Sequence, residues 1–92
     1  MQHRFNSAIC LLIKDENDYI NEWLDWHIKL GFEHFYIYDN GSKIPIKNTV
    51  SKQYLQFCSF IDFSSGYSYL QPDCYNNALQ EYGSTTKWMA FI

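Results

Sequence analysis

Residues 8–42, AICLLIKDENDYINEWLDWHIKLGFEHFYIYDNGS, decide the fold of this chain. Residues 8–13 form a continuous apolar run without alternation, which predicts a strand covered on both faces, as in a parallel sheet. A second apolar run follows at residues 35–38, and an amphipathic segment separates the two runs. A strand, a helix and a strand within about 30 residues predict a βαβ unit with a right-handed crossover.

The helix of this unit is predicted from an apolar stripe at helical spacing. The stripe consists of Ile20, Trp23, Leu24, His27, Ile28 and Gly31. The candidate N-caps of this helix precede the stripe and are Asp15, Asn17 and Asp18. Their short acidic and amide side chains can accept hydrogen bonds from the first helical turn. Gly31 is the expected residue beyond the last turn, where a left-handed backbone favours glycine.

The turn after the second strand admits two interpretations. Asn40-Gly41 is typical of a two-residue hairpin turn, so residues 35–46 could form an antiparallel hairpin. Pro45 cannot donate a hydrogen bond to a return strand, and we therefore favour a loop after Asn40. The rest of the chain predicts a short helix within residues 48–55, a strand at 57–63, a loop at 64–72, a helix at 73–82 and a strand at 88–92.

Length and composition limit the class of protein. With 92 residues the chain is one domain at most. The net charge of -3 and the absence of a Lys or Arg cluster argue against a nucleic-acid groove and against a polybasic membrane patch. Apolar runs are too short for a membrane span or for the core of a signal peptide. Together these features predict a cytoplasmic protein.

The cysteine and aromatic residues are expected to pack in the core and not to form a metal, disulfide or sugar-binding site. The three cysteines, Cys10, Cys58 and Cys74, show neither a disulfide framework nor a zinc-binding spacing. We therefore interpret them as small buried residues in a reducing cytoplasm. Aromatic residues make up 20% of the chain, and most lie inside apolar runs. That position favours a role in the core over a sugar-stacking surface.

Polar residues follow the predicted strands at positions where parallel sheets bind ligands. Lys14, Asp15 and Glu16 follow the first strand, and Asp39-Asn40 follows the second. The carboxyl ends of parallel strands share one edge, where carboxylates can accept hydrogen bonds from ribose hydroxyls. The alternative is turn and cap chemistry, for which Asp and Asn are equally suited. A third polar group, around the second helix, consists of Gln71, Asn76 and Asn77.

Two blocks of the chain resemble a known family. Residues 14–42, KDENDYINEWLDWHIKLGFEHFYIYDNGS, are similar to the start of glycosyltransferase domains of the family 2/family 92-like group. The family pattern there runs roughly K-N-E, E-W, a histidine, then L-G-x-x-H-F-x-I-Y-D-N-x-S. Residues 71–92, QPDCYNNALQEYGSTTKWMAFI, resemble a later block in which Q, Y-N and K-W-x-x-F precede D-x-D. The resemblance covers nearly the whole chain and is weakest at residues 43–56.

The resemblance implies a fold. Such domains have the GT-A fold, an α/β Rossmann-like sheet that binds a nucleotide-sugar at its carboxyl edge. We therefore expect its N-terminal half here: a four-stranded parallel sheet in the order third, second, first, fourth, with flanking helices. The expected first strand lies in the middle of this sheet.

The resemblance also implies roles for individual residues. Lys14, Asp15 and Glu16 match the loop that lines the donor nucleotide, although Asp15 stands where the family usually has Asn. Asp39, followed by Asn40, matches the acid that contacts the base or ribose. Asn76 matches a polar residue on the helix that faces the nucleotide, and Gln71 matches less closely.

The resemblance further implies what lies outside this chain. The chain ends just before the family's D-x-D would begin, and those acids hold Mn²⁺ or Mg²⁺ against the donor diphosphate. We expect no metal to be bound by these residues alone, and no catalytic residue among them. The full-length relative is expected to transfer a hexosyl group from a nucleotide-sugar, a UDP-sugar, to a glycan or lipid-linked acceptor with inversion.

Two other classes of function stay open on the sequence. One is a non-catalytic module that assembles as a homo-oligomer, because an exposed edge at the fourth strand favours pairing. The other is an unrelated small nucleotide-binding α/β protein, although no Gly-rich phosphate loop follows the first strand.

Overall fold

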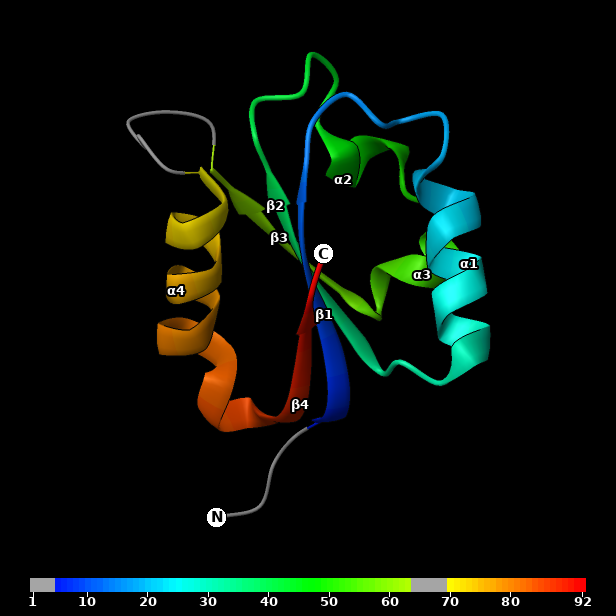
Figure 1. The fold of residues 1–92 in the computed structure, drawn as a ribbon. Coiled ribbons are helices and arrows are strands. Elements are labelled where there is room, and N and C mark those ends of the chain that lie inside the picture. The colour runs from blue at the N-terminus through cyan, green and yellow to red at the C-terminus, as the bar shows by residue number, and fades with distance from the viewer. Residues whose placement is uncertain (1–4, 64–69) are drawn as a thin grey trace.

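A computed structural model describes residues 5–63 and 70–92 of the chain. Its core is a four-stranded sheet in the order β3-β2-β1-β4, in which all neighbouring strands are parallel (Figure 1). The predicted α/β architecture and strand order are therefore confirmed. In chain order the elements are β1 (Phe5–Ile13), α1 (Ile20–Leu30), β2 (His34–Asp39), α2 (Ile46–Thr49), α3 (Lys52–Leu55), β3 (Cys58–Asp62), α4 (Leu70–Tyr82), η1 (Gly83–Thr85) and β4 (Thr86–Phe91).

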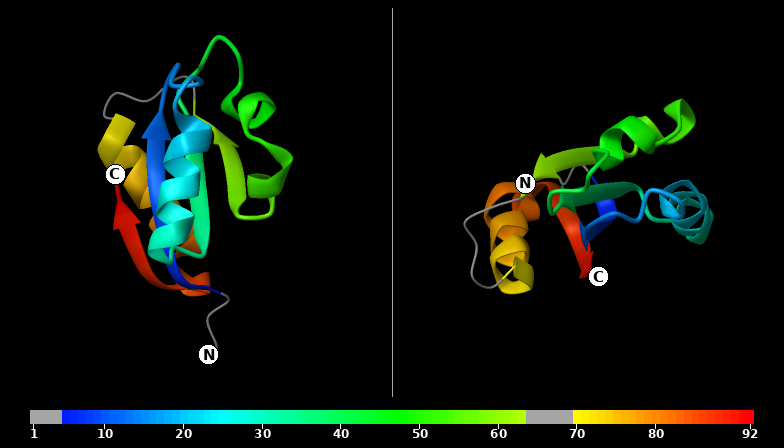
Figure 2. Two further views of the ribbon diagram at one scale, coloured as in Figure 1. Left: turned by 90° about the vertical axis from the view of Figure 1, so that its right-hand side faces the viewer. Right: turned by 90° about the horizontal axis from the view of Figure 1, so that it is seen from above.

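Helices cover both faces of the sheet. α1, α2 and α3 lie on one face, and α4 lies on the other (Figures 1 and 2). β1 is the third strand of four, so its side chains meet a helix on each face. This position explains why the first apolar run lacks alternation, because neither face of β1 is exposed to water.

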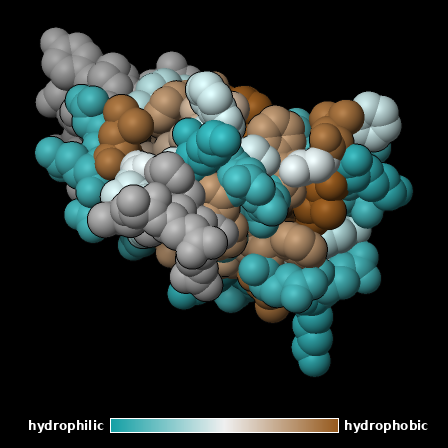
Figure 3. All heavy atoms as spheres, turned by 90° about the horizontal axis from the view of Figure 1, so that it is seen from below, coloured by the Kyte–Doolittle hydropathy of each residue, from teal (hydrophilic) through white to brown (hydrophobic). Residues whose placement is uncertain are grey.

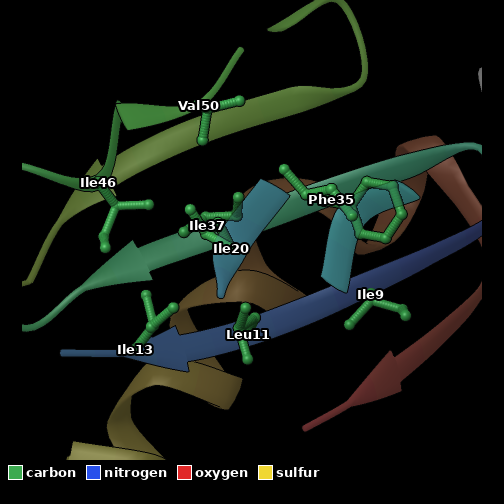
Figure 4. Packing of buried hydrophobic residues seen from close by; sticks show 9 residues of the cluster. Ile9, Leu11, Ile13, Ile20, Phe35, Ile37, Ile46 and Val50 are labelled. Carbon is green, nitrogen blue, oxygen red and sulfur yellow. The ribbon is translucent and has the colours of Figure 1, made fainter. Parts of the chain in front are cut away.

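The two faces of the sheet carry separate apolar clusters. Because strand side chains alternate between faces, Ile9 and Leu11 of β1 point towards α1 while Ala8 and Cys10 point towards α4. Figure 4 shows the cluster on the α1 face, which is built on β1, β2, α1 and α2. Its buried members are Ile9, Leu11, Ile13, Ile20, Leu24, Phe35, Ile37, Ile46 and Val50. Each fully buried side chain of this size stabilises the fold by roughly 1.5–3 kcal/mol.

The ends of α1 test two predictions. Gly31 adopts the left-handed conformation, with φ 109°, and its N–H donates to the carbonyl of Ile28 at 3.0 Å, which confirms the predicted helix end. The predicted N-caps were wrong: the capping position is Tyr19, without a side-chain cap. Asp15 and Asn17 instead bind the chain that follows β2.

Other boundaries differ from the predictions for local reasons. Residues 48–55 do not form one helix, because Val50 has an extended backbone between α2 and α3. The chain after Asn40 forms a loop, and β2 pairs with β3 in parallel, so the hairpin alternative is excluded. α4 begins at Leu70 and includes Pro72, since proline is tolerated in the first helical turn. The predicted loop at 64–72 therefore falls partly in α4, and residues 64–69 lie outside the described part.

Within the described ranges, the helices are all too short or too polar to span a membrane. The amino ends of the strands lie at the bottom of Figure 1. Figure 3 views that end of the molecule and shows apolar and polar residues intermixed on its surface.

Candidate functional site

The carboxyl ends of three strands form one edge. Ile13, Asp39 and Asp62 occupy the same level on β1, β2 and β3, as the pairs Ile13↔Asp39 and Asp39↔Asp62 show. The strand order reverses between β1 and β4, because the chain leaves β1 over the α1 face and enters β4 from the α4 face. In open α/β sheets, ligands bind outside the carboxyl ends of strands at such a reversal.

Asp39 organises the loop that follows β2. Its Oδ1 accepts a hydrogen bond from the Ser42 N–H at 3.0 Å, and its Oδ2 accepts one from the Ile46 N–H at 2.9 Å. Ile46 is the first residue of α2, so the carboxylate caps that short helix. The N–H of Asn40 donates to the carbonyl of Ile13 at 2.8 Å and extends the contact between the two strand ends.

Asp15 joins the loops after β1 and β2. Its N–H donates to Ser42 Oγ at 2.9 Å, and its Oδ1 accepts a hydrogen bond from the Lys43 N–H at 2.8 Å. Its backbone has φ 55°, the one positive φ among described residues other than glycine. The structure thus uses Asp15 and Asp39 in turn and cap chemistry, the alternative that the sequence left open for both residues.

Lys14 and Glu16 have a different setting. Both side chains are exposed, and both line a hollow of about 320 Å³ between the end of β1 and α1. Its wall is otherwise apolar, with Leu11, Tyr19 and Trp23 among the lining residues. The charged groups of Lys14 and Glu16 could bind the polar groups of a ligand, while the apolar wall contacts its apolar or aromatic surface.

Asp39 lines a second hollow, of about 240 Å³, on the side of β3. Ser42, Lys47 and Asp62 also line it. Of the predicted site residues, Lys14 and Glu16 line the first hollow and Asp39 lines the second. Asp15, Asn40 and Asn76 line neither of these two hollows. Asp62 was not among the predicted site residues, although it lies near the end of the third apolar run, as Asp39 does at the end of the second.

Two asparagines near the start of α1 hold a segment that follows β2. Asn17, a predicted N-cap, precedes the helix, and Asn21 lies in its first turn. Asn17 Nδ2 donates to the Ile44 carbonyl at 2.9 Å and to Thr49 Oγ1 at 2.8 Å. Asn21 Nδ2 donates to the Thr49 carbonyl at 3.1 Å, and its Oδ1 accepts from the Ser51 N–H at 2.8 Å. These amides fasten the segment containing α2 against α1, which positions one wall of the candidate site.

Two predicted polar residues of α4 point in different directions from the helix. Asn76 is exposed, whereas Asn77 Oδ1 accepts a hydrogen bond from the Tyr38 hydroxyl at 2.6 Å. Burial raises the pKa of Tyr38, which keeps this hydroxyl protonated as the donor. Asn77 therefore links α4 to β2. Gln71 lies in the first turns of α4, and its side chain falls outside the described part of the structure.

Clusters of side chains that bind metal ions are absent from the described residues. Among residues 5–63 and 70–92, no group of three or more His, Cys, Asp or Glu side chains is arranged to hold a metal ion. The Asp39 carboxylate already accepts two backbone hydrogen bonds.

Comparison with known proteins identifies a distant relative. The chain is 24% identical over 89 residues, 97% of its length, to a glycosyltransferase family 92 protein of Ricinus communis. A second match to a protein of that name is 31% identical over 43 residues, 47% of this chain. The first match spans 15% of the relative's length. No family model and no solved structure matches the chain. The chain is thus distantly similar to a family 92 glycosyltransferase.

Proposed function

We propose that this chain is the nucleotide-sugar-binding part of a glycosyltransferase. The observation that carries the proposal is the similarity to a family 92 glycosyltransferase over 97% of the chain. The parallel sheet supports it, because its strand order provides a reversal point at which nucleotides bind in such folds. The proposed fold type is GT-A, as the resemblance implies, and the cytoplasm is the proposed location.

The proposed donor is a UDP-sugar at the carboxyl edge of β1 and β2. Lys14 and Glu16 line the hollow beside α1, and their exposed side chains are free to meet phosphate and hydroxyl groups. Asp15, Asp39 and Asn40 shape the adjoining loops, and each carboxylate oxygen of Asp39 retains a lone pair beyond its one backbone bond. Asn76 and Gln71 are the proposed contributors from α4.

The proposed whole enzyme needs more than these residues. The match covers 15% of the family 92 relative's length. Metal ligands for Mn²⁺ or Mg²⁺, the catalytic base and the site for a glycan or lipid-linked acceptor are proposed for other parts of such an enzyme. The proposed reaction is inverting hexosyl transfer by direct displacement. The 92 residues alone are therefore expected to be inactive and to bind nucleotide weakly.

A titration with UDP tests the binding proposal. In ¹H–¹⁵N spectra with Mg²⁺ present, millimolar UDP should shift the amide signals of Lys14, Glu16 and Asn40. Glu16→Gln should reduce these shifts, and Glu81→Gln, at an exposed position in the last turn of α4, serves as the matched control. Unchanged spectra, or shifts confined to residues away from the edge, would contradict the proposal. Turnover of UDP-sugars by the isolated chain with Mn²⁺ would contradict the expected inactivity.

An interaction module is the second candidate function. β4 pairs with β1 alone, so its other edge is open in the described structure. Trp88, Phe91 and Ile92 at this strand are 69%, 37% and 48% exposed. Sedimentation across a concentration series tests this candidate: a dimer lost in Trp88→Lys, without any response to UDP, favours the module over the transferase part.

A further inference from the structure

Two cysteines meet between the central strand and α4. Cys10 lies on β1 and Cys74 lies on α4, 64 positions apart in the chain, and their sulfur atoms are 3.7 Å apart. Both residues are fully buried. Neither contributes to the candidate site, which lies at the end of the sheet beyond Ile13.

Small residues bring these sulfur atoms together. Ala78, one turn after Cys74 on α4, is fully buried, and so is Ala8, two residues before Cys10 on β1. All four belong to the apolar cluster on the α4 face. Because alanine and cysteine are short, the helix can lie close to the strand, and the two thiols come into direct contact.

The contact lets each thiol assist the other. Either sulfur atom can be the donor in the hydrogen bond between them. Burial acts to raise the pKa of both thiols, whereas the S–H group of one cysteine can stabilise a thiolate on the other. Whichever sulfur loses its proton is therefore the attacking thiolate.

We propose that Cys10 and Cys74 form a dithiol–disulfide modification site, in which oxidation by a peroxide fastens α4 covalently to β1. The thiolate of one cysteine, written here for Cys74, attacks one peroxide oxygen, the O–O bond breaks, and the departing oxygen leaves as water after protonation. This step converts Cys74 to a sulfenic acid. The Cys10 sulfur then attacks the Cys74 sulfur, and the hydroxyl group leaves with the Cys10 proton as a second water. The two sulfurs lose two electrons, and the peroxide gains them.

The geometry fits this step with a small movement. The sulfur–sulfur distance must shorten from 3.7 Å to about 2.05 Å, a change that side-chain rotation and a slight shift of α4 can supply. Because both sulfurs are buried, the peroxide reaches them during local opening of α4, so oxidation should be slow. Cys58 packs against the α1-face cluster, on the other side of the sheet, and cannot compete for either sulfur.

Mass spectrometry of the oxidised protein tests the proposal. Treatment of the chain with hydrogen peroxide should lower the intact mass by about 2 Da, the two hydrogens lost when a disulfide forms. Digestion with trypsin and with a protease that cleaves at aspartate separates the cysteines, because Asp62 and Asp73 lie between Cys58 and Cys74. The linked peptides should contain Cys10 and Cys74, and Cys58 should retain its thiol.

Matched variants separate the outcomes. Cys58→Ser should form the disulfide at an unchanged rate, whereas Cys10→Ser and Cys74→Ser should not lose the two hydrogens. The oxidised wild type should melt at least about 5 °C higher than the reduced protein, and dithiothreitol should reverse the shift. A disulfide that involves Cys58, a disulfide between two molecules, or sulfinic acid without any linked peptide would overturn the proposal. The mass change, the linked peptides and the melting shift are all measured on the wild-type protein. They therefore test the proposal even if a variant does not fold.

Discussion

The carboxylate of Asp39 should stabilise the folded state by anchoring the loop between β2 and α2. Its two oxygens accept hydrogen bonds from the Ser42 and Ile46 N–H groups at 3.0 Å and 2.9 Å. A hydrogen bond to a charged group contributes about 1.5–3 kcal/mol when it is well shielded. Asp39 is half-buried, which favours the lower end of this range. We therefore expect Asp39→Ala to lower the free energy of unfolding by about 2–4 kcal/mol.

Urea unfolding, followed by circular dichroism and by tryptophan fluorescence, measures this change. Asp39→Asn keeps one oxygen acceptor and should lose about half as much stability as Asp39→Ala. Asp62→Asn, at the same level on β3, is exposed and should leave the unfolding free energy within about 0.5 kcal/mol of the wild type. A change of less than about 0.5 kcal/mol for Asp39→Ala would refute the anchoring role and would favour a carboxylate reserved for a ligand.

A double variant sharpens the test. The Asp15 carboxylate binds the same loop by accepting a hydrogen bond from the Lys43 N–H. Asp15→Ala and Asp39→Ala should therefore be less than additive in unfolding free energy, because either change alone already releases part of the loop. Additive losses would show that the two carboxylates act on independent segments.

Three further predictions concern single residues. Asn17→Ala should lower the free energy of unfolding by about 1–2 kcal/mol in urea, since its amide donates to Ile44 and Thr49; an unchanged midpoint would contradict this role. Gly31→Ala should destabilise by about 1–2 kcal/mol through backbone strain alone, because nothing lies within 4 Å of the added Cβ at φ +109°. The matched Gly83→Ala, where Leu79 is 4.0 Å away, should not destabilise in the same melts. Burial raises the pKa of Cys58 to about 12. At pH 8, iodoacetamide should therefore alkylate Cys58 about a thousandfold more slowly in the folded protein than in the urea-unfolded protein. Comparable alkylation rates in the two states would contradict the burial of this thiol.

The fold was predictable because its signals are local or depend on burial alone. The run at residues 8–13 is apolar at every position since β1 has a helix on each face. Gly31 ends α1 as predicted because the left-handed backbone there depends only on neighbouring residues. β1 and β4 begin earlier than the apolar runs indicate, because their first residues, Phe5 and Thr86, pair with each other.

The site was less predictable because its polar residues bind partners far away in the chain. Asp15 and Asn17 are good N-caps by type, but residues 42–49 lie close to them in the fold and provide other donors and acceptors. The resemblance favours Asn76 over Asn77, yet only the phase of α4 decides which one reaches Tyr38. Such choices depend on the packing of segments against each other, and a single sequence does not show that packing.

The placement of β1 between β2 and β4 has a consequence for the order of folding. The pair β1·β2 requires only the first 39 residues, and it can form during synthesis together with α1. The pair β1·β4 joins Phe5 with Thr86. One edge of β1 therefore stays unpaired until the residues of β4 have been synthesised. Such long-range closure slows folding and leaves an apolar edge available to other chains in the meantime. The nascent chain is therefore expected to depend on chaperones most strongly between the completion of β2 and the arrival of β4.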